Sequence, residues 1–117
     1  GGEYEVIAGL DQRVMSRFRG IVIEMHRLDL IRDASWFSWT LKPFIRKLLT
    51  HFSPVHIHPN NAADVVEVHG YLIPRLLEVT FWRNDRISDC GVVRHLPHVL
   101  DRVNVPSRKD LTLHWQQ

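Results

Sequence analysis

The 117-residue sequence predicts an α/β fold, as a single domain or fragment with a core over residues 3–85 and an irregular extension over residues 86–117. Three short segments alternate apolar and polar residues, a pattern typical of strands. Between them, apolar residues recur at spacings of three and four, which indicates helices. At 44% hydrophobic and 24% charged residues, a chain of this length can bury one core and is too short for two.

The first predicted element is a helix over residues 3–17. Its apolar stripe consists of Ile7, Leu10, Val14 and Phe18. Acidic Glu3 and Glu5 favour the N-terminus of this helix electrostatically. Gly20 is expected to end the helix. Residues 21–26 then form a strand whose apolar density suits a sheet covered on both faces.

A second helix is predicted over residues 41–52, with Thr40 as its N-cap. Pro43 is tolerated if it falls in the first turn, where its missing amide has no partner to lose. Trp36-Phe37-Ser38-Trp39 precedes this helix and could form a lid or substrate wall. Packing at the helix entrance is favoured, because aromatic residues dominate core energetics.

The histidine-rich strand is predicted over residues 54–58. Val55 and Ile57 alternate with His56 and His58, so the two histidines share one face. A short strand is expected over residues 65–69 and a dense one over 76–82. Residues 96–103 could form one or two helical turns, and 111–115 a terminal strand or an ordered tail.

Titratable residues on these strands could meet at one edge of the sheet: Glu24, His26, His56, His58 and Glu78. Three interpretations are open. A buried polar ladder is favoured, because buried polar groups need partners. A general acid/base or substrate-binding site and a metal site are the alternatives. We expect His56 to lie deeper in the sheet than His58, which precedes the turn at Pro59.

Charge and composition limit the classes of partner that we expect for this chain. Lys and Arg number 15 against 13 for Asp and Glu, and the basic residues are scattered, so no nucleic-acid partner is expected. No long apolar run and no leader are found, so neither membrane attachment nor secretion is expected. The single cysteine, Cys90, fits a reducing, cytoplasmic location and a buried thiol rather than a nucleophile.

Several runs in this order carry a family resemblance: Gly2-Glu3-Tyr4-Glu5-Val6-Ile7, Gly20-Ile21-Val22-Ile23-Glu24-Met25-His26, Val55-His56-Ile57-His58-Pro59-Asn60-Asn61, Ile73-Pro74 and Leu77-Glu78-Val79-Thr80-Phe81. Together they resemble the C-terminal half of FkbM-type S-adenosylmethionine-dependent methyltransferases. The resemblance implies a partial Rossmann-like methyltransferase sheet with helices packed on it. In that sheet, strand 76–82 would run antiparallel between strands 21–26 and 55–58.

The resemblance also implies a function, the acceptor side of an O-methyltransferase whose substrate is a small hydroxylated molecule such as a sugar. His26 and His58 would be candidate bases, with Glu24 and Glu78 orienting them. The remaining residues would bind substrate: His56, Asn60 and Asn61. The implied cofactor is S-adenosylmethionine, although the family's glycine-rich turn and acidic strand ends are not in this sequence. No metal is assigned.

The alternative is a noncatalytic α/β binding or assembly module without a cofactor. In either case, a sheet that lacks the family's first strands would leave residues 21–26 as an apolar edge with unpaired backbone groups. Such edges recruit another strand unless they are blocked. We therefore expect a homo-oligomer formed through this edge.

Overall fold

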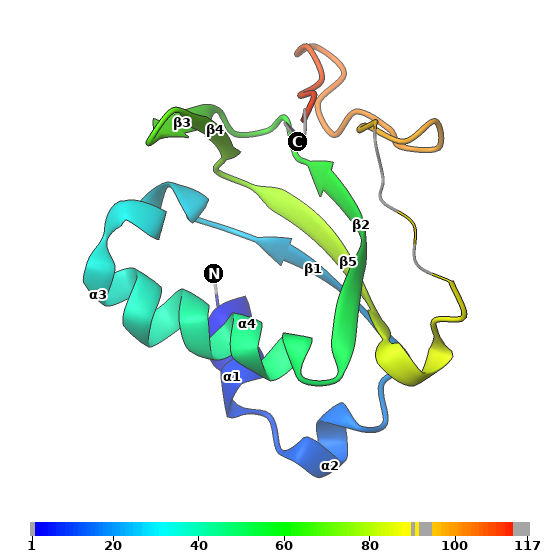
Figure 1. The fold of residues 1–117 in the computed structure, drawn as a ribbon. Coiled ribbons are helices and arrows are strands. Elements are labelled where there is room, and N and C mark those ends of the chain that lie inside the picture. The colour runs from blue at the N-terminus through cyan, green and yellow to red at the C-terminus, as the bar shows by residue number, and fades with distance from the viewer. Residues whose placement is uncertain (1, 90, 92–94, 114–117) are drawn as a thin grey trace.

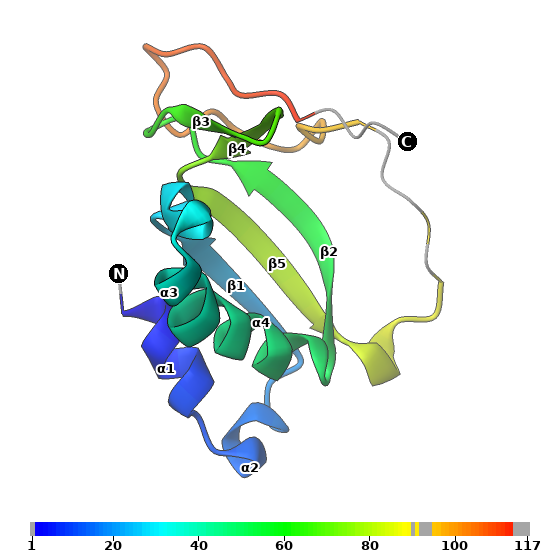
Figure 2. The same ribbon diagram turned by 60° about the vertical axis from the view of Figure 1, so that its left-hand side comes forward.

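A computed structural model describes residues 2–89, 91 and 95–113 (Figure 1). The fold is mixed α/β, with antiparallel strand pairs in two sheets. Helices cover one face of a three-stranded sheet, and a two-stranded hairpin lies at one end of it (Figure 2). Among the described residues, no helix is long and apolar enough to cross a membrane.

The three-stranded sheet contains β1 (Gly20–Met25), β5 (Leu77–Arg83) and β2 (Phe52–Pro59), in the order β1-β5-β2. The central strand β5 is antiparallel to both neighbours, so β1 and β2 end at the same end of the sheet. The expected position of this strand between the other two is confirmed. The described strands form no parallel pair, so the parallel pairing of a Rossmann-like sheet is not seen.

The two faces of the sheet differ, as the period-two pattern predicts. Ile23 and Met25 of β1 and Val79 and Phe81 of β5 are buried against the helices. On the opposite face Val22 is 69% exposed. The expectation that both faces would be covered is therefore wrong, because α1 and α4 lie on the same side of the sheet (Figure 2).

The predicted helix over residues 3–17 is interrupted, and this expectation is also wrong. It consists of α1 (Glu3–Gly9) and α2 (Gln12–Met15), separated by two extended residues, Leu10 and Asp11. Asp11 causes the break, because its side chain accepts a hydrogen bond from the Arg13 amide at 2.7 Å and so starts a new helix. Gly20 does not end the helix but opens β1. A Cβ there would lie 2.4 Å from the Trp82 ring, so the close strand contact requires glycine.

The second helix begins earlier than predicted. Asp33 caps α3 (Ala34–Trp36) by accepting from the Trp36 amide at 2.8 Å, so Thr40 is not the N-cap. A π-helical turn over Phe37–Leu41 joins α3 to α4 (Lys42–Leu49). The Lys42 amide bonds to the carbonyl of Phe37, five residues back. The wider turn lets Pro43 follow inside a continuous helix, where a regular turn would clash with its ring.

The core lies between the helices and the sheet, and Phe44, Leu48 and Phe52 are almost fully buried in it. Tyr4 of α1 makes edge contacts with Trp36 at 5.5 Å and with Phe44 at 5.0 Å between ring centroids. The packing interpretation of the aromatic run is therefore confirmed for Trp36.

The connection after β2 forms a hairpin of β3 (Val65–Val68) and β4 (Tyr71–Pro74). His69 and Gly70 both have positive φ, 50° and 83°, which suits a two-residue hairpin turn. A short 3-10 turn, Asn84–Arg86, follows β5. The helical turns expected over residues 96–103 are not formed, and a single bridge joins Leu96 to Leu113. Cys90 lies outside the described residues.

Candidate functional site

Three of the predicted site residues form a row across the sheet. Glu78 of β5 is the register partner of Glu24 on β1 and of His58 on β2. Register partners point to the same face, and this is the face opposite the helices. The row lies where β1 and β2 end and β5 begins. The strand register therefore brings these three side chains together, as the alternation pattern predicted.

His26 follows β1 and lies between two carboxylates. Its Nδ1 is 3.1 Å from Glu3 Oε1 and its Nε2 is 3.1 Å from Glu24 Oε1. Its backbone amide donates to Glu3 Oε1 at 3.0 Å, and its carbonyl accepts from the Tyr4 hydroxyl. Glu3 thus ties α1 to the end of β1, and both ring nitrogens of His26 have protein partners.

Burial and these contacts shift the pKa values of two residues on α1, Glu3 and Tyr4. Burial alone would raise the pKa of Glu3, but hydrogen bonds from its own amide and from the amide and ring of His26 outweigh it. The pKa of Glu3 is therefore lowered. Burial raises the pKa of the Tyr4 hydroxyl, and the neighbouring Glu3 charge adds to the effect.

His56 pairs with an aspartate from the extension. Its Nε2 lies 2.8 Å from Asp101 Oδ1, and the second oxygen of Asp101 accepts the His98 amide at 2.6 Å. The rings of His56 and His98 meet edge to face, with centroids 6.1 Å apart. His56 belongs to the predicted group by face but contacts a different carboxylate from those expected.

His58 is the most buried histidine of the group, at 5% exposure. The expectation that His56 would be the deeper of the two is wrong, because the side chain of His56 stays 34% exposed beside the extension and that of His58 is only 7% exposed. The Nε2 atom of His58 is buried and has no hydrogen-bond partner. The nearest opposing charge is Asp110 Oδ1 at 3.9 Å, which is too far for a hydrogen bond.

The two asparagines after β2 have different partners. Asn60 donates to Glu24 Oε2 at 3.4 Å and accepts the Ala62 amide at 2.9 Å. The side chain of Asn61 hydrogen-bonds to the extension: its oxygen accepts the Val105 amide at 2.8 Å, and its nitrogen donates to the carbonyls of Val105 and Arg108. Both polar atoms of the Asn61 side chain therefore hold the extension in place.

The extension supplies site residues that sequence reasoning missed: Asp101, Asn104 and Asp110. Asn104 donates to Glu78 Oε2 at 3.1 Å. Their part of the chain has neither helical nor strand periodicity, so no face could be assigned to them from the sequence. The one available signal is the run of Asn, Pro and Asp residues, which indicates a loop but not its position.

The site is rich in hydrogen-bond acceptors. Carboxylates of Glu24, Glu78, Asp101 and Asp110 surround or border the histidines. Such a site repels anions and favours ligands that carry hydroxyl donors. Within the described ranges, no group of three or more His, Cys, Asp or Glu side chains is arranged to hold a metal ion.

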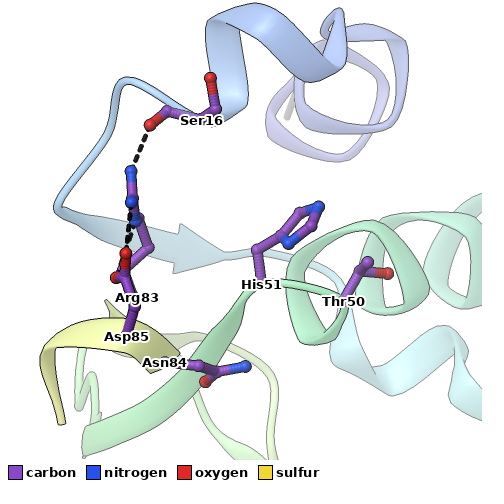
Figure 3. A pocket seen from close by; sticks show the side chains of 6 residues that line it. All are labelled: Ser16, Thr50, His51, Arg83, Asn84 and Asp85. Atoms are coloured by element: carbon purple, nitrogen blue, oxygen red, sulfur yellow. Dashed lines mark hydrogen bonds and ion pairs between the residues drawn. The ribbon is translucent and has the colours of Figure 1, made fainter.

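A pocket of about 240 Å³ lies at the other end of the sheet (Figure 3). It is lined by Ser16, Thr50, His51, Arg83, Asn84 and Asp85. The Arg83 guanidinium is already engaged by the Asp85 carboxylate and by the Ser16 carbonyl. Arg83 ends β5, whereas Glu78 stands near its beginning, so this pocket is separate from the polar row.

Comparison of the sequence with family models and curated proteins, and of the fold with solved structures, finds no match.

Proposed function

We propose that this chain is the acceptor-side portion of an S-adenosylmethionine-dependent O-methyltransferase, and that it binds a small hydroxylated molecule such as a sugar. The observation that carries the proposal is the row of Glu24, Glu78 and His58 at the end of the sheet. The order β1-β5-β2, with the central strand reversed, supports it, because the resemblance in sequence implies this arrangement. Open α/β sheets usually bind ligands at the ends of their strands.

The contacts distinguish the two candidate bases. Both ring nitrogens of His26 lie 3.1 Å from carboxylates, so this ring is held in place by Glu3 and Glu24. The Nε2 atom of His58 has no hydrogen-bond partner, and its charged neighbour Asp110 is 3.9 Å away. In the proposed reaction His58 therefore takes the proton of the acceptor hydroxyl. His26 positions Glu24, and Glu24 and Glu78 accept hydrogen bonds from neighbouring hydroxyls.

The proposal places the S-adenosylmethionine site outside this chain. β1 is followed by His26-Arg27 and β2 by Asn60-Asn61, so neither strand leads into a glycine-rich turn that could approach a cofactor closely. The proposal therefore assigns only acceptor binding and proton acceptance to this chain. Residues outside it would hold the methyl donor.

The test uses the natural gene product that contains this chain. Transfer of a labelled methyl group from S-adenosylmethionine to hydroxylated small molecules is measured for the unaltered protein and for His58→Gln. Loss of turnover with an unchanged melting temperature supports the proposal. His51→Gln, in the pocket at the far end of the sheet, is the matched control and should keep full turnover. Turnover that falls only in proportion to the folded fraction would contradict the role of His58.

A noncatalytic binding or assembly module is the second candidate. It is favoured by the partners of the site residues, since His26, His56 and Glu78 all contact side chains of this chain. A polar ladder of this kind stabilises a fold without chemistry. The two candidates differ in the labelled-methyl assay, because a noncatalytic module yields no methylated product with any acceptor.

A further inference from the structure

Residues 98–110, hereafter the strap, lie across the end of β2 beside the hairpin (Figure 2). Side-chain hydrogen bonds hold the strap along its length. Near its start, Asp101 bonds to His56 at 2.8 Å, and in its middle Asn104 bonds to Glu78 at 3.1 Å. Near its end, Asn61 binds the strap backbone through both its oxygen and its nitrogen.

The strap buries little apolar surface. Val99 and Leu100 are 83% and 73% exposed. Segments held by polar contacts, with few buried apolar side chains, open at a small fraction of the global unfolding free energy. The strap can therefore detach from the sheet while the helices and β1, β2 and β5 stay folded.

Closure of the strap leaves one polar atom unsatisfied. His58 Nε2 is buried, has no hydrogen-bond partner and faces Asp110 Oδ1 across 3.9 Å. A hydroxyl has one hydrogen and the Asp110 carboxylate only accepts, so two neighbouring hydroxyls of one molecule could satisfy these atoms, one donating to Nε2 and one to Oδ1, each at about 2.8 Å. Because Nε2 is covered in the closed form, such hydroxyls enter only while the strap is open.

The geometry points to a ligand-coupled strap: residues 98–110 open to admit a neutral polyhydroxylated molecule and close over it, with one hydroxyl donating to His58 Nε2 and a neighbouring hydroxyl donating to Asp110 Oδ1. This inference rests on the proposed function, since it places the acceptor in the same site. Anionic ligands are disfavoured because carboxylates of Glu24, Glu78 and Asp110 lie nearby, and a polyhydroxylated ligand could donate several hydrogen bonds along the row. Asp110 thus becomes a ligand-binding residue that selects for a hydroxyl at this position.

Amide hydrogen exchange of the full chain tests the coupling. The reporter is the amide of Val105, which bonds to Asn61 Oδ1 outside the strap. The probes are myo-inositol, D-glucose and D-galactose, each added without a methyl donor. A ligand that binds only the closed form should slow exchange by about tenfold at ten times its dissociation constant. The Asn84 amide, which bonds to the His51 carbonyl at the far end, should not change.

Variants separate the strap from the ligand contact. Asp110→Ala should abolish the effect of the polyol, and Asn61→Ala should speed exchange at Val105 with or without polyol. Glu67→Ala, an exposed carboxylate on β3, is the matched control and should respond as the unaltered chain does. A polyol effect that survives Asp110→Ala, or no effect of any of the three polyols, would overturn the inference. If choline slowed amide exchange in the strap and the polyols did not, the assignment of a neutral ligand would be overturned.

The two hypotheses can fail independently. Methyl transfer by the longer gene product without strap protection would leave the proposed function in place and remove the strap. Slower amide exchange in the strap without methyl transfer would leave the strap in place and remove the proposed function. The chain would then belong to the noncatalytic binding class.

Discussion

Glu24 and Glu78 stand directly opposite each other on the paired strands β1 and β5. Like charges in this position destabilise a sheet. Three neighbours offset the repulsion: His26 lies 3.1 Å from Glu24, Asn60 donates to Glu24 at 3.4 Å, and Asn104 donates to Glu78 at 3.1 Å. The Glu24–Glu78 pair therefore lowers the stability of the sheet locally, which is common for residues of functional sites.

The first prediction removes one charge of this pair. Glu78→Gln should raise the free energy of unfolding at pH 7 by about 0.2–1 kcal/mol, because the repulsion is lost while the amide oxygen can still accept from Asn104. Chemical denaturation measures the change. Glu67→Gln on β3, which stands opposite Leu72, is the control and should have no effect. A destabilised Glu78→Gln chain would show that the charge contributes to stability.

The second prediction concerns pH and Glu3. Because the pKa of Glu3 is lowered in the folded chain, its carboxylate stabilises the fold above its ordinary pKa of 4.5. This contribution is lost as pH falls from 4.5 through the lower folded value. Glu3→Gln should therefore be less stable than the unaltered chain at pH 7, and the difference should shrink below pH 4.5. Denaturation across this range tests it, with exposed Glu5→Gln as control; a constant difference would contradict the linkage.

The third prediction compares the two strand histidines. His56→Leu removes the partner of Asp101 and should cost about 0.5–1.5 kcal/mol. His58→Leu removes a buried nitrogen that has no partner, so the free energy of unfolding should change by less than about 1 kcal/mol. Parallel denaturation experiments measure both. A larger loss for His58→Leu would mean that its ring makes a stabilising polar contact.

The fourth prediction addresses self-association. β1 pairs with β5 on one side only, and its other edge has no strand among the described residues. Sedimentation should reveal dimers or larger species at high concentration, because such an edge recruits a second strand. Val22→Lys, at an exposed position on β1, should weaken association. Val6→Lys, at a similarly exposed position on α1, should not. A strictly monomeric chain would contradict the proposed edge contact.

Local patterns predicted the main strands well. The alternation in β1 and β5 identified both the strands and the faces they turn to the helices, because side chains on a strand alternate strictly. In β2 it identified the strand but not the burial, since Val55 is exposed and His58 is buried. The same reasoning failed at residues 3–17 and at the start of the second helix. There the side chains of Asp11 and Asp33 cap new helices, and a capping aspartate does not disturb the apolar stripe by which the helices were recognised.

The site was only half predictable. Glu24, Glu78 and His58 come together because strand register carries residues far apart in sequence to the same row. Asp101, Asn104 and Asp110 come from a segment without periodicity, and their positions depend on long-range contacts with Asn61 and His56. The burial of His58 follows from that segment. It could not be inferred from the strand alone.

The π-helical turn at Phe37–Leu41 makes the length of this region critical. A wide turn contains one residue more than the α-helical turn it replaces. Deleting a single residue there would leave a regular helix, in which the residues before the turn keep nearly their present rotation relative to α4 but the backbone ahead of Pro43 narrows. Pro43 would then meet the carbonyl that the wide turn now moves aside. Substitutions at Ser38 or Trp39 should be tolerated where a deletion is not, so the number of residues in this turn matters more than their identity.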